Sequence, residues 1–253
     1  MKFLDYFLHN FGFIFLLELG AAMAGTYFLR TVKNYKPETR LFVIYLWVVV
    51  IVEFVGLYPT LAYLSNYKIL GFVEDTPFAR NYWWYNIYHI IKYSIFFRFF
   101  IGQLDNKKNQ RILYFMSIAL IISFVINYII SDSFWNTSFY VTIVGSLYLL
   151  VLILLYHFSL LKSNKILVVK SSIEFYISIG LMVWHISITP VLIYNKYFSL
   201  ANPAFIKLHS NLLILLNIFL YGLIILGYLV CAKLKAKENY LQSESDLVID
   251  NSE

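Results

Sequence analysis

Several ionisable side chains stand inside stretches of this sequence that are otherwise apolar. His89 and Lys92 lie within the aromatic run 81–101, and Glu18 and Glu53 lie within apolar runs nearer the N-terminus. A charged group inside a lipid bilayer is costly unless it is paired or faces water. Residues of these types can form an ion pair, relay protons or bind a polar ligand, so they are the first candidates for a functional site.

The spacing within 81–101 places polar side chains on one face of a helix. Tyr85, His89 and Lys92 follow one another by steps of four and three residues, and Asn86 flanks them. We expect this face to point into a bundle of helices. The two acids are candidates to meet it there, because they are predicted at a similar depth on neighbouring helices.

Two further polar residues, His185 and Asn217, lie deep in later apolar stretches. Taken singly, such residues more often form hydrogen bonds between helices than bind ligands. The full candidate set for a ligand pocket or an intramembrane polar network is Glu18, Glu53, Tyr85, Asn86, His89, Lys92, His185 and Asn217.

Two interpretations of this set remain open. In the first, the residues form a ligand pocket or proton pathway that opens to the outside, because they are predicted in the outer half of the membrane or at its midplane. In the second, they form a buried ion pair that fixes the register of the helices. Both predict that Lys92 is charged and paired, first with Glu53 and otherwise with Glu18.

The composition explains why these residues are expected inside a membrane. The chain has 253 residues, of which 60% are hydrophobic and only 13% are charged, and its mean hydropathy is +0.70. A soluble domain carries about 25% charged residues. The sequence therefore predicts that lipid surrounds most of the chain, and the bilayer is its first expected partner.

The hydrophobic pattern predicts an all-α fold, a polytopic seven-transmembrane-helix bundle over residues 1–236. A span needs roughly 20 apolar residues, and the predicted spans are 11–29, 41–63, 81–101, 112–130, 137–161, 173–195 and 209–232. The N-terminus has no pattern of a cleavable signal peptide, so the first stretch is expected to remain a span. Residues 237–253 are predicted to form a short, flexible, acidic cytoplasmic tail.

The distribution of basic residues predicts the orientation. Thirteen lysines and arginines fall on one side of the predicted spans: Arg30, Lys33, Lys36, Arg40, Lys107, Lys108, Arg111, Lys162, Lys165, Lys170, Lys233, Lys235 and Lys237. Five fall on the other side: Lys2, Lys68, Arg80, Lys196 and Lys207. Because cytoplasmic loops are enriched in Lys and Arg, the N-terminus is expected outside and the C-terminus in the cytoplasm. The net charge of +6 is explained in the same way, and no nucleic-acid partner is expected.

No motif for catalysis, metal binding or cofactor binding is found in the sequence. HExxH, P-loop and G-x-S-x-G patterns are missing, and Cys231 is the single cysteine. A bis-histidine haem would need His89 and His185 at matching depth, and nothing else supports one. The sequence therefore predicts no catalytic residue, metal ligand or cofactor, and a membrane-embedded enzyme is the least favoured of the roles considered.

Three segments resemble uncharacterised seven-helix bacterial inner-membrane proteins. They are Leu17-Glu18-Leu19-Gly20-Ala21-Ala22 continuing to Gly25-Thr26-Tyr27, Glu53-Phe54-Val55-Gly56-Leu57-Tyr58, and Asn81-Tyr82-Trp83 continuing to Tyr85-Asn86-Ile87-Tyr88-His89. The resemblance covers nearly the whole chain and implies a multi-pass protein of the bacterial inner membrane. It implies no activity.

Three roles fit these observations. A sensory or signalling protein with an outward-facing polar pocket comes first, since the loops are short and no catalytic motif is present. A small-solute or proton-coupled transporter comes second, because transporters often have internal repeats or broken helix pairs that this sequence lacks. An accessory subunit of a larger membrane complex comes third. The expected protein partner is a cytoplasmic signalling protein or a membrane complex.

Overall fold

A computed structural model describes residues 11–163, 169–197 and 203–250 of the chain. The long helices are α2 (Gly12–Thr31), α3 (Pro37–Gly56), α5 (Tyr82–Ile101), α6 (Lys107–Ile130), α7 (Phe139–Leu161), α8 (Ile173–Tyr197) and α9 (Pro203–Asp250). The short helix α4 (Tyr58–Leu64) and the 3-10 helices η1 (Gly71–Val73), η2 (Pro77–Ala79) and η3 (Ser133–Trp135) lie between them. Within these ranges there is no strand, so the all-α prediction is confirmed.

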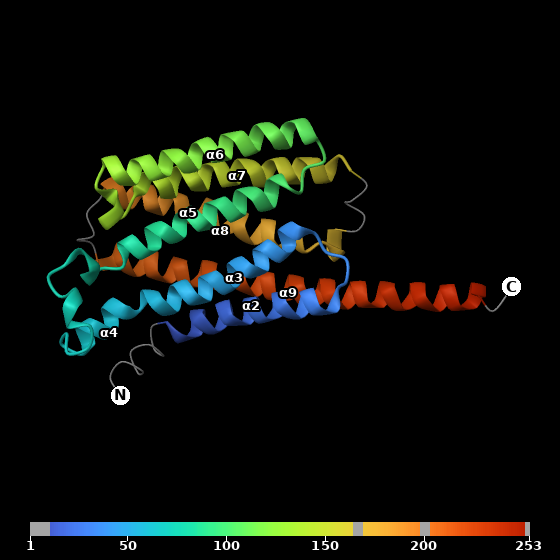
Figure 1. Cartoon of the computed structure of the whole chain (residues 1–253), viewed down its shortest axis with the longest axis horizontal. Coiled ribbons are helices and arrows are strands. Elements are labelled where there is room, and N and C mark those ends of the chain that lie inside the picture. The colour runs from blue at the N-terminus through green and yellow to red at the C-terminus, as the bar shows by residue number, and fades with distance from the viewer. Residues whose placement is uncertain (1–10, 164–168, 198–202, 251–253) are drawn as a thin grey trace.

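The long helices lie side by side along one axis, and α9 extends beyond the others at one end (Figure 1). α2 packs against both α3 and α9, so the first and last long helices are neighbours. α9 also packs on α8, and α8 packs on α7. α5 contacts α3, α6 and α7, which surrounds it with protein on three sides.

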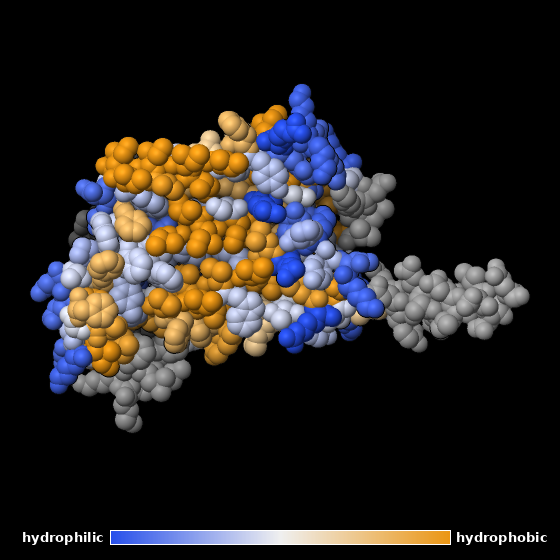
Figure 2. All heavy atoms as spheres, viewed as in Figure 1, coloured by the Kyte–Doolittle hydropathy of each residue, from blue (hydrophilic) through white to orange (hydrophobic). Residues whose placement is uncertain are grey.

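The surface has the pattern expected of a membrane protein. An apolar band covers the middle of the bundle, and hydrophilic residues gather towards the two ends of the helices (Figure 2). Six helical segments are long and apolar enough to cross a bilayer: Gly12–Thr31, Pro37–Leu64, Lys107–Ile130, Phe139–Leu161, Ile173–Tyr194 and Phe205–Lys237. The protein is therefore a multi-pass helical membrane protein. α5 does not meet the same criterion, because its many Tyr and Trp residues and its polar side chains lower its hydropathy.

The predicted span 41–63 is divided in the structure. α3 ends at Gly56, and α4 begins at Tyr58 with Pro59 in its first turn. Proline has no N–H and cannot continue the hydrogen-bond ladder of a preceding helix. Glu53 consequently lies in the last turn of α3, closer to the end of its helix than the sequence predicts.

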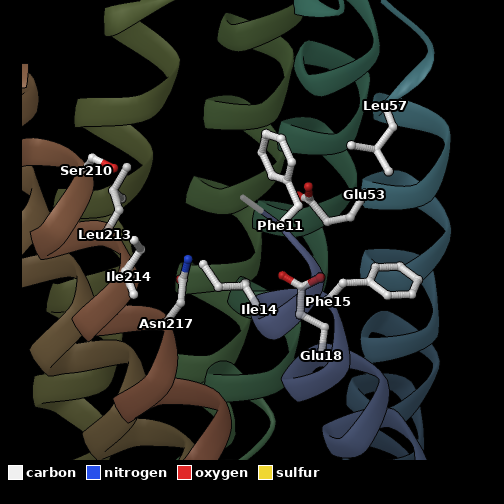
Figure 3. A pocket seen from close by; sticks show the side chains of 10 residues that line it. All are labelled: Phe11, Ile14, Phe15, Glu18, Glu53, Leu57, Ser210, Leu213, Ile214 and Asn217. Atoms are coloured by element: carbon white, nitrogen blue, oxygen red, sulfur yellow. The ribbon is translucent and has the colours of Figure 1, made fainter. Parts of the chain in front are cut away.

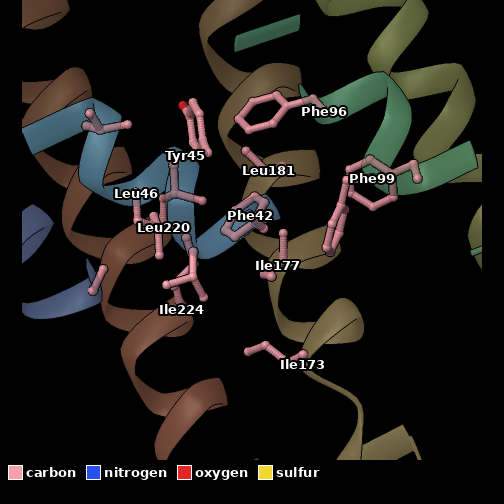
Figure 4. Packing of buried hydrophobic residues seen from close by; sticks show 14 of the residues in the cluster. Phe42, Tyr45, Leu46, Phe96, Phe99, Ile173, Ile177, Leu181, Leu220 and Ile224 are labelled. Carbon is pink, nitrogen blue, oxygen red and sulfur yellow. The ribbon is translucent and has the colours of Figure 1, made fainter. Parts of the chain in front are cut away.

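The interior of the bundle is rich in aromatic side chains (Figure 4). Phe42 and Tyr45 of α3 interlock with Phe96 and Phe99 of α5: the ring centroids of Phe42 and Phe99 are 5.0 Å apart, and those of Tyr45 and Phe96 are 4.8 Å apart. All four side chains are buried. This packing fixes α3 and α5 against each other, and with them the polar groups that the two helices carry.

Hydrogen bonds from aromatic side chains also stabilise the connection between α4 and α5. The Tyr58 hydroxyl donates to the carbonyl oxygens of Phe78 and Arg80, at 2.6 and 2.9 Å, and accepts from Trp83 Nε1 at 2.8 Å. Trp84 Nε1 donates to the Val52 carbonyl at 3.0 Å. The indoles of Trp83 and Trp84 at the start of α5 therefore donate hydrogen bonds to protein groups.

The last helix continues through most of the predicted tail. α9 runs without interruption to Asp250, whereas the sequence predicts a flexible segment from residue 237. Residues 233–250 contain neither Gly nor Pro, and the commonest good helix formers among them are Lys, Leu and Glu. This composition accounts for the helical backbone.

Candidate functional site

A cavity of about 270 Å³ lies between α2, α3 and α9 (Figure 3). It is lined by Phe11, Ile14, Phe15, Glu18, Glu53, Leu57, Ser210, Leu213, Ile214 and Asn217. Three of the predicted site residues thus line one cavity. The two carboxyl groups reach it from different helices, Glu18 from α2 and Glu53 from α3, and its remaining lining is mostly apolar.

Glu18 is held in the cavity by the close packing of α2. The side chains of Ala21 and Ala22 are fully buried, and Gly25 leaves no room for a Cβ beside Val43 of α3. Small residues such as these let helix backbones approach closely. Glu18 is itself 5% exposed, and among the described residues its Oε2 atom has no hydrogen-bond partner. Its carboxyl group interacts with the hydroxyl of Tyr221 on α9.

Glu53 is half-buried at the end of α3 and is oriented by α5. Its Oε2 atom accepts a hydrogen bond from the Tyr85 hydroxyl at 2.9 Å. Gly56 makes this contact possible, because a Cβ there would lie 2.7 Å from the Tyr85 hydroxyl. Glu53 and Glu18 are near enough to act on each other electrostatically. Two carboxylates in one cavity repel each other unless a cation or a shared proton intervenes.

Asn217 completes the polar lining from α9. Its Oδ1 atom accepts from Trp184 Nε1 of α8 at 3.0 Å. This bond leaves the amide nitrogen of Asn217 directed towards the cavity, as Figure 3 shows. The bond to Trp184 is the interhelical hydrogen bond that the sequence predicts for a lone polar residue, and Asn217 also contributes to the cavity.

The predicted ion pair of Lys92 is wrong. Lys92 is buried, and among the described residues neither Glu18 nor Glu53 acts on it electrostatically. Its Nζ atom instead lies 4.5 Å from the ring centroid of Tyr93 and 5.9 Å from that of Tyr88. Cation–π contacts of this kind partly compensate for the loss of water. Neither Glu53 nor Glu18 is its partner.

Lys92 and Glu53 do not pair because they lie at different depths. The residue of α5 that meets Glu53 is Tyr85, and Lys92 lies two helical turns further along, or about 10 Å. Tyr45 and Tyr88 occupy the space between the two levels, with their hydroxyls 2.7 Å apart. Glu53 lies three residues before the end of α3, and its bond to Tyr85 places it at the level of the first turn of α5.

The separation of the two charges can be tested by a double-mutant cycle. With Glu53→Gln, Lys92→Met and the double variant, the coupling energy in the free energy of unfolding is expected to be below about 0.5 kcal/mol, because residues that share no contact act additively. A buried ion pair would instead give several kcal/mol, because removing one partner strands the other. The measurement is unfolding in mixed detergent micelles. A coupling energy above about 2 kcal/mol would show that Glu53 and Lys92 interact directly after all.

A second polar cluster surrounds Lys92 at the centre of the bundle. His185 of α8 is 2% exposed, and its Nδ1 atom lies 2.9 Å from Ser146 Oγ of α7. The Tyr93 hydroxyl donates to the Thr142 carbonyl at 3.0 Å and lies 3.3 Å from the same serine oxygen. Lys92 acts electrostatically on both His185 and His89. The structure therefore joins three predicted residues, and two hydroxyl side chains that were not predicted, in one cluster.

His89 differs from the other members of this cluster. Its Nδ1 atom is buried and has no hydrogen-bond partner within the described ranges. The ring lies between those of Tyr88 and Tyr93, with centroids 6.1 and 6.4 Å away. His89 therefore has a buried nitrogen atom without a hydrogen-bond partner in the described part of the chain, close enough to Lys92 to feel its charge.

Asn86 contacts the connection between α6 and α7 and not the two acids. Its Nδ2 atom donates to the carbonyl oxygens of Ser133, Phe134 and Asn136, at 3.1, 2.8 and 2.9 Å. These atoms belong to η3 and the residue that follows it, in the connection between α6 and α7. Asn86 is thus directed away from the acidic cavity and fixes this connection to α5.

Removing this amide should destabilise the connection. Asn86→Ala is expected to lower the free energy of unfolding by about 2 kcal/mol, because buried carbonyl groups lose their donor. The expected readout is earlier proteolysis within residues 131–138, together with a lower melting temperature. Asn109→Ala, at an exposed position of α6, is the matched control and should have little effect. Equal protease resistance of both variants would contradict the assigned role.

Several residues around both clusters escape prediction from the sequence. They are Tyr45, Tyr88, Tyr93, Ser146, Trp184 and Tyr221. Tyr and Trp are also common at membrane interfaces, so their presence in a span does not show which of them are buried. The spacing offers one signal, because Tyr221 follows Asn217 by one helical turn and so lies on the same side of α9. Tyr221 contacts Glu18 of α2, and Asn217 contacts Trp184 of α8.

The fold and the cavity together define a class: a multi-pass helical membrane protein with a carboxylate-lined cavity and a separate buried cation. No protein-family model matches the chain, and no match was found among curated proteins or solved structures.

Proposed function

We propose that this protein is a seven-span sensory protein of the bacterial inner membrane that binds a small cationic ligand in the cavity between α2, α3 and α9. The observation that carries the proposal is the pair of carboxyl groups, Glu18 and Glu53, in one cavity, with a buried oxygen of Glu18 that has no partner among the described residues. An ammonium group placed there would supply both the missing donor and the opposite charge.

The chemistry of the lining supports a cation. Phe11 and Phe15 stand beside the two carboxyls, and aromatic faces attract ammonium groups. Asn217 and Ser210 offer additional polar atoms for orientation. Ligand pockets are usually apolar cavities with a few placed polar groups, and most are larger than about 300 Å³. A cavity of about 270 Å³ therefore suits a small amine.

Seven spans are proposed because α5 has the position of a span. It has the same length as α2 and α3, and it packs against α3, α6 and α7. Its polar residues Asn86 and Lys92 are buried in protein, so its low hydropathy does not measure its contact with lipid. An odd number of spans also places the two termini on opposite sides of the membrane.

The proposed orientation follows the basic residues. Lysines and arginines are concentrated beyond the ends of α2, α5 and α7 and in the second half of α9, which is expected on the cytoplasmic side. The acidic cavity then lies towards the outer face. The ligand would therefore enter from outside the cell.

α9 supports signalling as the role of the bound ligand. Ser210, Leu213, Ile214 and Asn217 line the cavity, and the same helix continues past the other helices to Asp250 (Figure 1). A ligand can shift a conformational equilibrium only if it binds the two states differently. A helix that contacts the ligand at one end and a cytoplasmic partner at the other provides such a connection.

Proton-coupled transport is the second candidate. It is favoured by the hydroxyl pair of Tyr45 and Tyr88, which lies between the acidic cavity and the cluster of Lys92, His89 and His185. Hydroxyl and imidazole groups in sequence are the usual elements of a proton relay.

The test is ligand binding to purified protein in lipid nanodiscs. Methylammonium, choline and agmatine are titrated while the melting temperature and tryptophan fluorescence are recorded, since Trp184 is bonded to a cavity residue. At least one amine is expected to raise the melting temperature in a saturable way. A folded protein that responds to none of them would overturn the proposal. Uptake of the bound amine into proteoliposomes would favour the transporter over the sensor.

A further inference from the structure

A second cavity, of about 690 Å³, lies at the opposite end of the bundle. Its walls come from the α2–α3 connection, the beginning of α3, the ends of α5 and α7, the beginning of α8, and the part of α9 that leaves the bundle. The lining residues include Lys33, Lys36 and Lys235, and also Glu174. Three cations from two segments, the α2–α3 connection and α9, thus line one cavity.

The lysines have no acidic partner in the described part of the chain. Lys33 and Lys36 are exposed, and Lys36 donates to the side-chain oxygen of Gln103, which is neutral. Lys235 is half-buried, with its Nζ atom 5.7 Å from the ring centroid of Phe28. Three ammonium groups therefore repel one another around the cavity without an internal counter-ion.

Glu174 does not neutralise them. Its Oε1 atom accepts from the Thr39 hydroxyl at 3.1 Å, and its Oε2 atom accepts from the Ser172 hydroxyl at 2.7 Å. The carboxylate is thus held by two neutral donors in the first turn of α8, where the helix dipole favours negative charge. With this acid included, the lining still has a net charge of +2.

We infer that this cavity binds a phosphate-bearing anion, presented by an anionic lipid headgroup or by free phosphate. Basic pockets between transmembrane helices at the headgroup level are suited to anionic lipids. The cavity also has apolar walls, formed by Phe28, Leu160 and Ile173, against which an acyl chain could lie. Hydrophilic residues gather at the end of the bundle beyond which α9 extends (Figures 1 and 2).

The test compares two triple variants that remove the same charge. The cavity variant combines Lys33→Gln, Lys36→Gln and Lys235→Gln. The control combines Lys107→Gln, Lys108→Gln and Lys162→Gln, which are exposed on the same side and do not line the cavity. Each protein is purified in neutral detergent and titrated with phosphatidylglycerol, phosphatidylcholine or inorganic phosphate. Melting temperature and lipid retention in native mass spectrometry are recorded.

Phosphatidylglycerol is expected to stabilise the wild type and the control, and to bind the cavity variant about 100-fold more weakly, at roughly 1 kcal/mol for each lysine. Phosphatidylcholine, which has no net charge, should have little effect. Stabilisation by inorganic phosphate as well would assign a soluble source of the anion. Equal responses of the two triple variants, or no response of the wild type to any anion, would overturn the inference.

The single variant Lys33→Gln keeps the test valid if the triple variant does not fold. Lys33 is exposed, so its replacement should leave the fold intact and weaken binding about fivefold. The outcome is independent of the acidic cavity, because amine binding at Glu18 and Glu53 is measured separately and at the other end of the bundle.

Discussion

Exchange of both cavity carboxyls for amides, Glu18→Gln with Glu53→Gln, is expected to weaken the binding of a small amine about 1000-fold. Removing one partner of a buried charge pair costs about 2–5 kcal/mol, and about 1.4 kcal/mol corresponds to a tenfold change in affinity. Both carboxyls face one cavity, so a bound ammonium group would lose both opposite charges. The measurement is isothermal titration of the amine into protein in nanodiscs.

The double variant is also expected to remain folded. Glutamine has nearly the shape of glutamate, and the exchange removes the repulsion between two carboxylates in a confined space. The melting temperature without ligand should therefore stay the same or rise. Glu74→Gln, in the exposed connection between α4 and α5 at the same end of the bundle, is the matched control and should leave affinity unchanged. Wild-type affinity in the double variant would exclude the cavity as the binding site.

The glycine at position 145 should be the most sensitive point of the buried cation cluster. A Cβ on Gly145 would lie 2.5 Å from two ring atoms of Tyr93, whose side chain is fully buried. The ring cannot retreat without losing the bond from its hydroxyl to Thr142. Gly145→Ala is therefore expected to lower the free energy of unfolding by about 3 kcal/mol, combining overpacking with the loss of a buried hydrogen bond.

The matched control is a glycine in another span with open space around it. A Cβ on Gly222 would meet no atom within 4 Å. Alanine is the better helix former, so Gly222→Ala should be neutral or more stable by up to about 1 kcal/mol. Both variants are compared by unfolding in mixed micelles. Equal stability of Gly145→Ala and the wild type would mean that Tyr93 is not held as described.

The sequence by itself determines the positions of the helices. Spans require long apolar stretches, and such stretches are visible in the sequence, so each predicted span overlaps a long helix. The ends differ most for the span 41–63, which is divided between α3 and α4, and for the last span, whose helix α9 continues to Asp250. The sequence also identifies which polar residues lie in these helices. A polar group in an apolar stretch needs an explanation wherever the helix is placed.

Only the tertiary structure decides which polar residues meet. The end of the predicted span 41–63 places Glu53 about ten residues deep, whereas α3 ends at Gly56, only three residues after it. The rotation of each helix about its axis is set by close packing, such as that of Phe42 against Phe99. Hydropathy predicts neither the depth of Glu53 nor the rotation of the helices, because both depend on contacts between residues far apart in the chain. The predicted set therefore divides into an acidic cavity beside α9, a cluster around Lys92, and a structural contact at Asn86.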